Sequence, residues 1–227
     1  MPGYQLKQET ICVAGVASLQ IRSLLDRQQY ADPLGAAEAL GISSAAWPLF
    51  GLLWPSGMHL AETMAERPLL DDETILEIGC GLALASLISH RRGALVTASD
   101  CHPLAPDFLL ENLRLNGLPP LRYCHGNWAA DAVHRIGEHA PRLRGRFDLI
   151  IGSDVLYERD DGGTLTAFIA RHANPRNEVL IVDPNRGNRA AFTRRMAALG
   201  YALEETPLRA AAGLPAYSGR LLHYRRD

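Results

Sequence analysis

The sequence lacks the features that mark several large classes of protein. It holds only four cysteines, separated by 68, 21 and 23 positions, which is the spacing of neither a zinc site nor a thioredoxin-type redox motif. No apolar run approaches the roughly 18 residues of a membrane-spanning helix. The first residues show no basic segment followed by an apolar one, so we expect no secretory signal.

Neither sign of charge dominates the chain. Lysine and arginine number 23 against 25 aspartates and glutamates, which gives a net charge of −2. A dedicated binder of nucleic acid or of anionic membranes needs a basic excess that this balance does not supply. The eight histidines show no spacing typical of metal ligands. We therefore expect a cytoplasmic, metal-free protein that binds neither nucleic acid nor membrane.

What the chain does contain is enough apolar sequence for a core. Its 227 residues are 47% hydrophobic and 21% charged, which suits one domain overall. From about Asp71 onward, apolar β-rich runs alternate with helical patterns. This alternation predicts an α/β, Rossmann-like fold whose seven-stranded sheet is mostly parallel, with an antiparallel last strand and helices on both faces. The expected strands are Thr74–Gly79, Ala94–Ser99, Leu121–His125, Phe147–Ser153, Glu178–Asp183, Tyr201–Thr206 and Gly219–Arg225.

Helices are expected between these strands. Leu82–Arg91, Ala105–Asn116 and Asn188–Leu199 each end at a glycine, the residue that most often closes a helix. Residues 71–227 would thus form the core, and residues 1–70 an extension packed on it. For this extension the pattern predicts a strand at Leu19–Arg22, a short helix before Gly41, an apolar Trp-Pro loop and a helix over Met58–Arg67.

The strongest local motif is Glu77-Ile78-Gly79-Cys80-Gly81, where a strand turns into a helix. Glycines at such a bend let the backbone approach a ligand, and the following helix presents unpaired N–H groups. The dinucleotide fingerprint would need a third glycine where Leu84 stands. Together with the carboxylate of Glu77, this favours a ligand with a positive charge over one with two phosphates.

Polar residues follow three further strands at the carboxyl edge of the expected sheet, where ligands bind in open α/β folds. Asp100 lies 19 residues after Gly81, a spacing at which a carboxylate accepts hydrogen bonds from a ribose diol. Trp128 offers a flat ring for stacking against adenine. Asp154 and Tyr157 follow Ser153, the last residue of the fourth strand of the core.

With these motifs the sequence resembles a class I, seven-β-strand S-adenosylmethionine-dependent methyltransferase. More narrowly, it resembles the methyltransferase-like protein-lysine methyltransferases. The resemblance extends from Trp47 to about Asp183, and Trp54-Pro55-Ser56-Gly57 together with Asp154-x-x-Tyr157 makes it specific. Related enzymes that methylate adenine N6 have Pro-Pro where this chain has Val155-Leu156, which argues against a DNA-base substrate.

The resemblance implies S-adenosylmethionine as cofactor and a protein that presents a lysine as substrate, with no statement on oligomeric state. It implies a cofactor pocket formed by Trp54, Gly79, Cys80, Gly81, Asp100, Trp128 and Ser153, and a catalytic pair formed by Asp154 and Tyr157. The chain departs from the family at Ala83, where a third glycine is common, and at Ala129, where glycine often follows the tryptophan.

Two other functions stay open on the sequence alone. One is methylation of a small metabolite, and the other is a non-catalytic module that binds the cofactor or a partner.

The sequence also has two basic features to which we assign no function. We expect Arg186 to be solvated in a turn, and Arg142, Arg144 and Arg146 to lie in a solvated loop.

Overall fold

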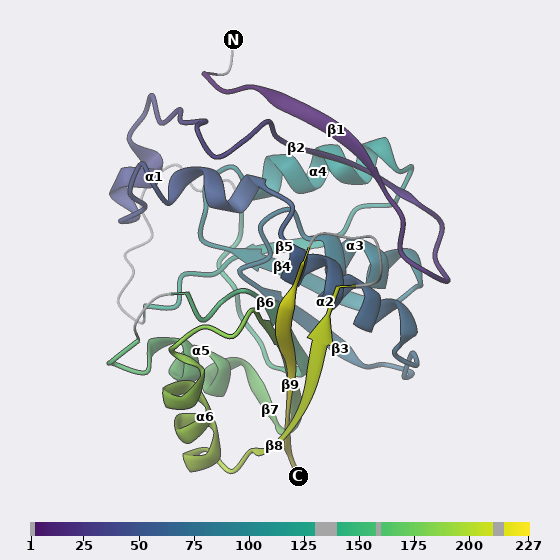
Figure 1. Cartoon of the computed structure of the whole chain (residues 1–227), viewed down its shortest axis with the longest axis vertical. Coiled ribbons are helices and arrows are strands. Elements are labelled where there is room, and N and C mark those ends of the chain that lie inside the picture. The colour runs from purple at the N-terminus through teal and green to yellow at the C-terminus, as the bar shows by residue number, and fades with distance from the viewer. Residues whose placement is uncertain (1–2, 130–139, 158–159, 211–215) are drawn as a thin grey trace.

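The computed structural model describes residues 3–129, 140–157, 160–210 and 216–227. Its main feature is a seven-stranded sheet in the order β5-β4-β3-β6-β7-β9-β8 (Figure 1). Only β9 runs antiparallel to its neighbours β7 and β8, so the predicted fold is confirmed. The strands are β3 (Thr74–Ile78), β4 (Leu95–Asp100), β5 (Arg122–His125), β6 (Phe147–Ser153), β7 (Ala173–Asp183), β8 (Ala202–Arg209) and β9 (Ser218–Arg226).

Helices cover both faces of this sheet. Leu149 and Ile151 of β6 pack with helices α2 (Pro55–Glu66), α3 (Leu84–Arg91) and α4 (Ala105–Leu115). Ile150, between them, points to the other face, where α5 (Thr164–His172) and α6 (Arg189–Ala198) lie. This alternation explains why β6 reads as a continuous apolar run, since both of its faces are buried.

The order of the strands reverses beside β3. From β3 the chain proceeds to β4 and β5 on one side, and then continues at β6 and β7 on the other. Such a switch point leaves a crevice at the carboxyl ends of the two central strands, here β3 and β6, and ligands of open α/β folds bind there.

Several element boundaries differ from those the sequence predicted. Helix α2 begins at Pro55 rather than Met58, because proline is well tolerated in the first turn of a helix. Strand β7 begins at Ala173, five residues early. Helix α5 was not predicted as a separate element; both oxygens of Asp160 accept backbone N–H groups of its first turn, from Thr164 at 2.7 Å and Leu165 at 3.0 Å.

The N-terminal segment forms a hairpin of β1 (Leu6–Ile11) and β2 (Leu19–Leu24), followed by the short α1 (Ala36–Ala39). Strand β1 escapes sequence detection because it buries no residue fully, so it lacks apolar alternation. Strand β2 docks on α4 through two asparagines. Asn112 Oδ1 accepts the N–H of Arg22, and Asn116 Oδ1 accepts that of Gln20, both at 2.8 Å.

The apolar Trp-Pro segment is a 3₁₀ helix, η1 (Trp47–Gly51), rather than a loop over the sheet. Trp47 is 1% exposed. Phe50 stacks on His102 with ring centroids 3.6 Å apart, and meets Phe108 of α4 edge-on at 5.1 Å. Burial of these large rings attaches the segment to the start of α4.

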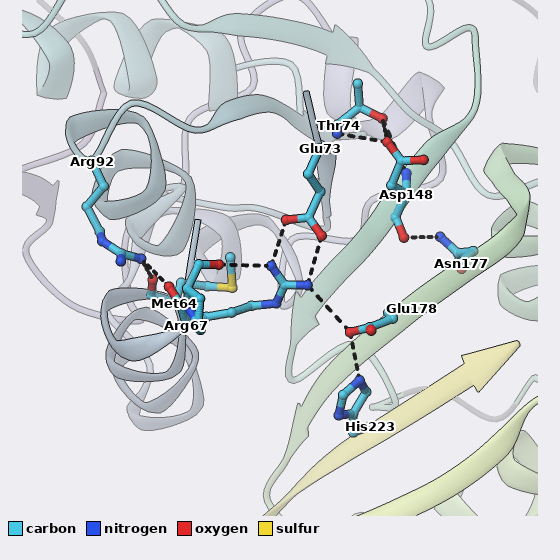
Figure 2. A network of polar contacts seen from close by, with 10 residues as sticks. Met64, Arg67, Glu73, Thr74, Arg92, Asp148, Asn177, Glu178 and His223 are labelled. Carbon is cyan, nitrogen blue, oxygen red and sulfur yellow. Dashed lines mark hydrogen bonds and ion pairs between the residues drawn. The ribbon is translucent and has the colours of Figure 1, made fainter. Parts of the chain in front are cut away.

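A polar network joins the end of α2 to the amino ends of the parallel strands (Figure 2). Arg67 donates two hydrogen bonds to the Glu73 carboxylate, at 2.6 and 2.8 Å, and a longer one to Glu178 at 3.5 Å. His223 of β9 bonds to Glu178 at 2.9 Å, and Arg92 donates to the carbonyl oxygens of Met64 and Arg67. The charged side chains of this network are therefore all paired with one another or with backbone carbonyl oxygens.

Within the described residues, none of the helices combines the length and the apolar content that spanning a membrane would require.

Replacing Arg67 with alanine should lower the free energy of unfolding by about 2–3 kcal/mol, because it leaves the Glu73 carboxylate largely buried and unpaired. Glu73 is 10% exposed and Arg67 16%. Urea unfolding would measure the change. Arg114→Ala is the matched control, since its pair with Glu111 is 69% exposed on the arginine side, and it should leave the unfolding midpoint unchanged. Equal effects of the two variants would contradict the role given to the Arg67 network.

Candidate functional site

The two glycines of the bend after β3 pack against different neighbours. Both have left-handed backbones, with φ of 56° at Gly79 and 51° at Gly81, a conformation that glycine adopts without strain. A Cβ at Gly81 would lie 2.7 Å from the carbonyl oxygen of Phe50, so η1 packs directly on this backbone. A Cβ at Gly79 would lie 3.5 Å from the ring of Trp128. Trp128 therefore faces bare backbone.

Glu77 is 3% exposed, and its carboxylate serves the helix that follows. Oε2 accepts hydrogen bonds from the backbone N–H, at 2.8 Å, and from the hydroxyl of Ser86, in the first turn of α3. Burial raises the pKa of Glu77 to about 7, although the bonds from Ser86 oppose the shift. The bonds that Glu77 makes are thus internal to the protein, and its attraction for a positively charged ligand stays a prediction.

Asp100 ties the bend to the neighbouring strand. Its Oδ2 accepts the N–H of Gly81 and its Oδ1 accepts that of His102, both at 2.8 Å. The side chain is 8% exposed, and burial raises its pKa. The backbone N–H of Cys101 bonds to this carboxylate as well. An ionised carboxylate has about four lone-pair positions, so Asp100 retains capacity for a further donor such as a hydroxyl.

This arrangement fits S-adenosylmethionine, whose ribose carries two adjacent hydroxyls. The Ser99 hydroxyl, one residue before Asp100, is buried and makes no hydrogen bond to any described residue. A buried hydroxyl without a partner among the described residues thus lies next to the carboxylate that the sequence assigned to the ribose. Cys80 lies within the bend, and burial raises the pKa of its thiol, which agrees with an unreactive side chain.

The start of α2 brings Trp54 to the edge of the sheet at which Ser153 lies. A Cβ at Gly57, in the first turn of α2, would lie 3.6 Å from the Ser153 hydroxyl, so this helix begins beside the end of β6. Trp54 immediately precedes α2. Its indole N–H donates to the carbonyl of Leu49 at 2.9 Å, and the Arg27 guanidinium lies 4.7 Å from its ring centroid.

Asp154 follows β6 with a left-handed backbone, φ 58°, which is uncommon for any residue except glycine and which aspartate and asparagine tolerate best. Arg186, from the loop after β7, donates from both Nε and Nη2 to Oδ1 of Asp154 at 2.6 Å. Arg186 is exposed, as expected, with 38% of its side chain accessible, but it also pairs with the candidate catalytic carboxylate. Oδ2 of Asp154 accepts no hydrogen bond among the described residues. Tyr157, three residues on, is 47% exposed.

The structure adds residues around Asp154 that the sequence did not single out. The Tyr217 hydroxyl lies 2.9 Å from that of Ser56, and its ring centroid is 4.4 Å from that of His59 on α2. Asp183 at the end of β7 is fully buried, and within the described chain its Oδ1 has no partner. Burial raises the pKa of Asp183, and the charge of Asp154 raises it further. Asp183 was recognisable as a strand end, whereas no local pattern marks Tyr217.

Comparison with known proteins bears on this site. A family model described as lysine methyltransferase matches residues 45–197. The electron transfer flavoprotein beta subunit lysine methyltransferase of Mus musculus is 26% identical over 142 residues, which cover 61% of this chain and 51% of that protein. The histone-arginine methyltransferase METTL23 of Rattus norvegicus is 29% identical over 129 residues, 55% of each chain. The chain thus spans about half the length of these relatives.

The fold also matches solved structures. Magnesium protoporphyrin IX methyltransferase from Synechocystis PCC 6803, solved with bound S-adenosylmethionine, aligns with a TM-score of 0.58 at 16% identity. The alignment covers 75% of this chain and 78% of that one. At this identity the likeness establishes the fold.

Glu77 makes stability depend on pH in a defined direction. Its pKa is about 7 in the folded protein against an ordinary 4.5, so between these values the folded state holds a proton that the unfolded state has lost. Stability from this group therefore falls as pH rises through the window, by about 3 kcal/mol in all. Glu77→Gln, which cannot ionise, should equal the parent protein near pH 5 and exceed it near pH 8 in urea unfolding. A stability difference between the two proteins that does not change with pH would refute this.

Proposed function

The chain belongs to the lysine methyltransferase family, and from that premise we propose that it transfers a methyl group from S-adenosylmethionine to a lysine side chain of a protein. The observation that carries the proposal is the bond between the Gly81 amide and the Asp100 carboxylate at the switch point of the sheet. It leaves a carboxylate with free lone pairs beside a glycine bend, which is what a ribose and its attached chain require.

We assign the cofactor to Trp54, Gly79, Cys80, Gly81, Asp100, Trp128 and Ser153. Asp100 would accept the ribose hydroxyls, the backbone of the Gly79–Gly81 bend would line the cofactor chain, and Trp128 would form a wall for the adenine. When bound, S-adenosylmethionine supplies a methyl group on a positively charged sulfur that departs as a neutral thioether. Because this leaving group is good, holding the acceptor in line and excluding water account for most of the rate acceleration.

We assign the acceptor amine to Asp154 and Tyr157. Arg186 occupies Oδ1 of Asp154 and leaves Oδ2 to accept a hydrogen bond from an amine. Asp183 lies close enough for its pKa to respond to the charge of Asp154. Tyr157 would provide a ring face for a cationic side chain.

Asp154 would orient the amine rather than remove its proton. A lysine amine has a pKa of about 10.4 and must be neutral to attack. A carboxylate beside it favours the charged form, which suits recognition of the incoming side chain and opposes deprotonation. Arg186 reduces this effect, because it neutralises part of the Asp154 charge.

Asparagine at position 154 is the sharpest test of the acceptor role, because it tolerates the left-handed backbone and removes only the charge. Asp154→Asn should abolish methyl transfer to proteins of a lysate, measured with labelled S-adenosylmethionine and mass spectrometry. Its affinity for S-adenosylhomocysteine should stay within about twofold of the parent value. Asp71→Asn, at an exposed position, is the control. Equal loss of transfer and of cofactor affinity would make Asp154 a cofactor or folding residue instead.

Asp100→Asn should give the opposite pattern. Replacing a charged acceptor by an amide weakens its hydrogen bonds, and we expect S-adenosylhomocysteine to bind roughly 10- to 100-fold less tightly in calorimetry. Asp107→Asn, an exposed residue in the first turn of α4, should bind as the parent does. If the parent protein gives no heat with S-adenosylhomocysteine, or if only metabolites or arginines of the lysate become labelled, the proposed function is wrong.

A further inference from the structure

A cavity of about 450 Å³ lies beyond the end of β5, between the chain that leads into β6 and the last turns of α5. None of the residues at the Glu77–Gly81 bend lines it, and neither do Asp100 and Asp154. Its floor includes Leu143 and Phe168, which are 5% and 2% exposed. The cavity is therefore separate from the residues that we assign to the cofactor and the acceptor.

Among the described residues, the walls of the cavity carry four guanidinium groups and no carboxylate. Arg142, Arg144, Arg146 and Arg171 all line it. None of the four forms an ion pair within the part of the chain that the structure describes. Arg146 donates a single bond to the carbonyl of Ala173 at 3.3 Å, and Arg171 lies 5.9 Å from the ring centroid of Phe168. Their charges are thus left without a counterion from these residues.

The segment that supplies three of these arginines has a fixed backbone. The Leu143 N–H donates to the carbonyl of His125 at 2.9 Å, and the His125 N–H donates to that of Pro141 at 2.8 Å. The chain here continues the edge of the sheet as a parallel bridge between His125 and Arg142. The three arginines are exposed, as expected for a solvated loop, but the segment also pairs with the end of β5 and lines a cavity.

His172 lines the same cavity, and its pKa responds to three of these arginines. Its Nδ1 lies 2.9 Å from the carbonyl oxygen of Gly145. Burial lowers the pKa of His172, and the charges of Arg171, Arg142 and Arg146 lower it further. Three guanidinium groups thus act on one imidazole.

We propose that this cavity binds a small molecule that carries two or more phosphate groups. Guanidinium groups pair with phosphate through two parallel hydrogen bonds, and a volume of about 450 Å³ lies in the range of sites for small ligands. Four positive charges without an ion-pair partner among the described residues exceed what one phosphate neutralises. Because the whole chain has a net charge of −2, the positive field is local, whereas nucleic acid needs an extended basic surface.

Calorimetry with inorganic pyrophosphate and tripolyphosphate tests the site directly. We expect binding that weakens as ionic strength rises, and that weakens about tenfold or more in Arg142→Gln/Arg144→Gln. The matched control is Arg176→Gln/Arg194→Gln, which removes the same charge at two exposed positions outside the cavity. No binding by the parent protein, or equal weakening by both double variants, would overturn the proposal.

Two further measurements distinguish this site from the cofactor pocket and its proposed ligand from other anions. Pyrophosphate should bind equally well in the presence of saturating S-adenosylhomocysteine, and competition between them would place the anion in the cofactor pocket instead. Hexaglutamate and a short single-stranded RNA should bind more weakly than tripolyphosphate. Tighter binding of either polymer would replace the proposed ligand class by an acidic peptide or a nucleic acid.

A measurement on the parent protein remains decisive if the double variant does not fold. Phenylglyoxal modifies accessible arginines, and mass spectrometry locates the modified residues. Pyrophosphate should protect Arg142 and Arg144 and leave Arg176 reactive. Protection of all three to the same degree, or of none, would refute the site.

Discussion

The hydrogen bond from the Gly81 amide to the Asp100 carboxylate is the interaction on which the rest of the molecule's functional edge depends. It joins the ends of two parallel strands, β3 and β4, and a second bond from the Cys80 amide to the Ser99 carbonyl at 3.0 Å supports it. The resulting bend lies so close to Phe50 that position 81 has no room for a side chain. One carboxylate thereby shapes the bend, positions η1 and keeps lone pairs available for a ligand.

The amino and carboxyl edges of the sheet differ in how completely their polar groups are paired. At the amino edge, Arg67, Glu73, Glu178 and His223 satisfy one another (Figure 2). At the carboxyl edge, Asp154 has a left-handed backbone, and Asp183 has an oxygen without a partner among the described residues. Strained or incompletely bonded groups collect where proteins bind ligands.

The sequence predicted the sheet and the order of its elements, because these depend on local signals, whereas the cofactor residues that it singled out remain a prediction. Apolar runs marked the buried strands, and the interval from Gly81 to Asp100 marked two neighbouring strand ends. Strand β1 was missed because it pairs with β2 without burying a face. The pairing of Arg186 with Asp154 was missed because the two residues are 32 positions apart and come close only through the pairing of β6 with β7.

The neighbourhood of Asp154 combines residues from distant parts of the chain, since Ser56 bonds to Tyr217 across 161 positions. On the ribosome, the segment from η1 to Trp128 emerges with everything needed for the Gly81–Asp100 bond. Tyr217 is synthesised long afterwards, and it reaches α2 only when β8 and β9 have joined the sheet. The contact of Tyr217 with α2 therefore depends on the last strands to be synthesised, whereas the Gly81–Asp100 bond joins residues that are made much earlier.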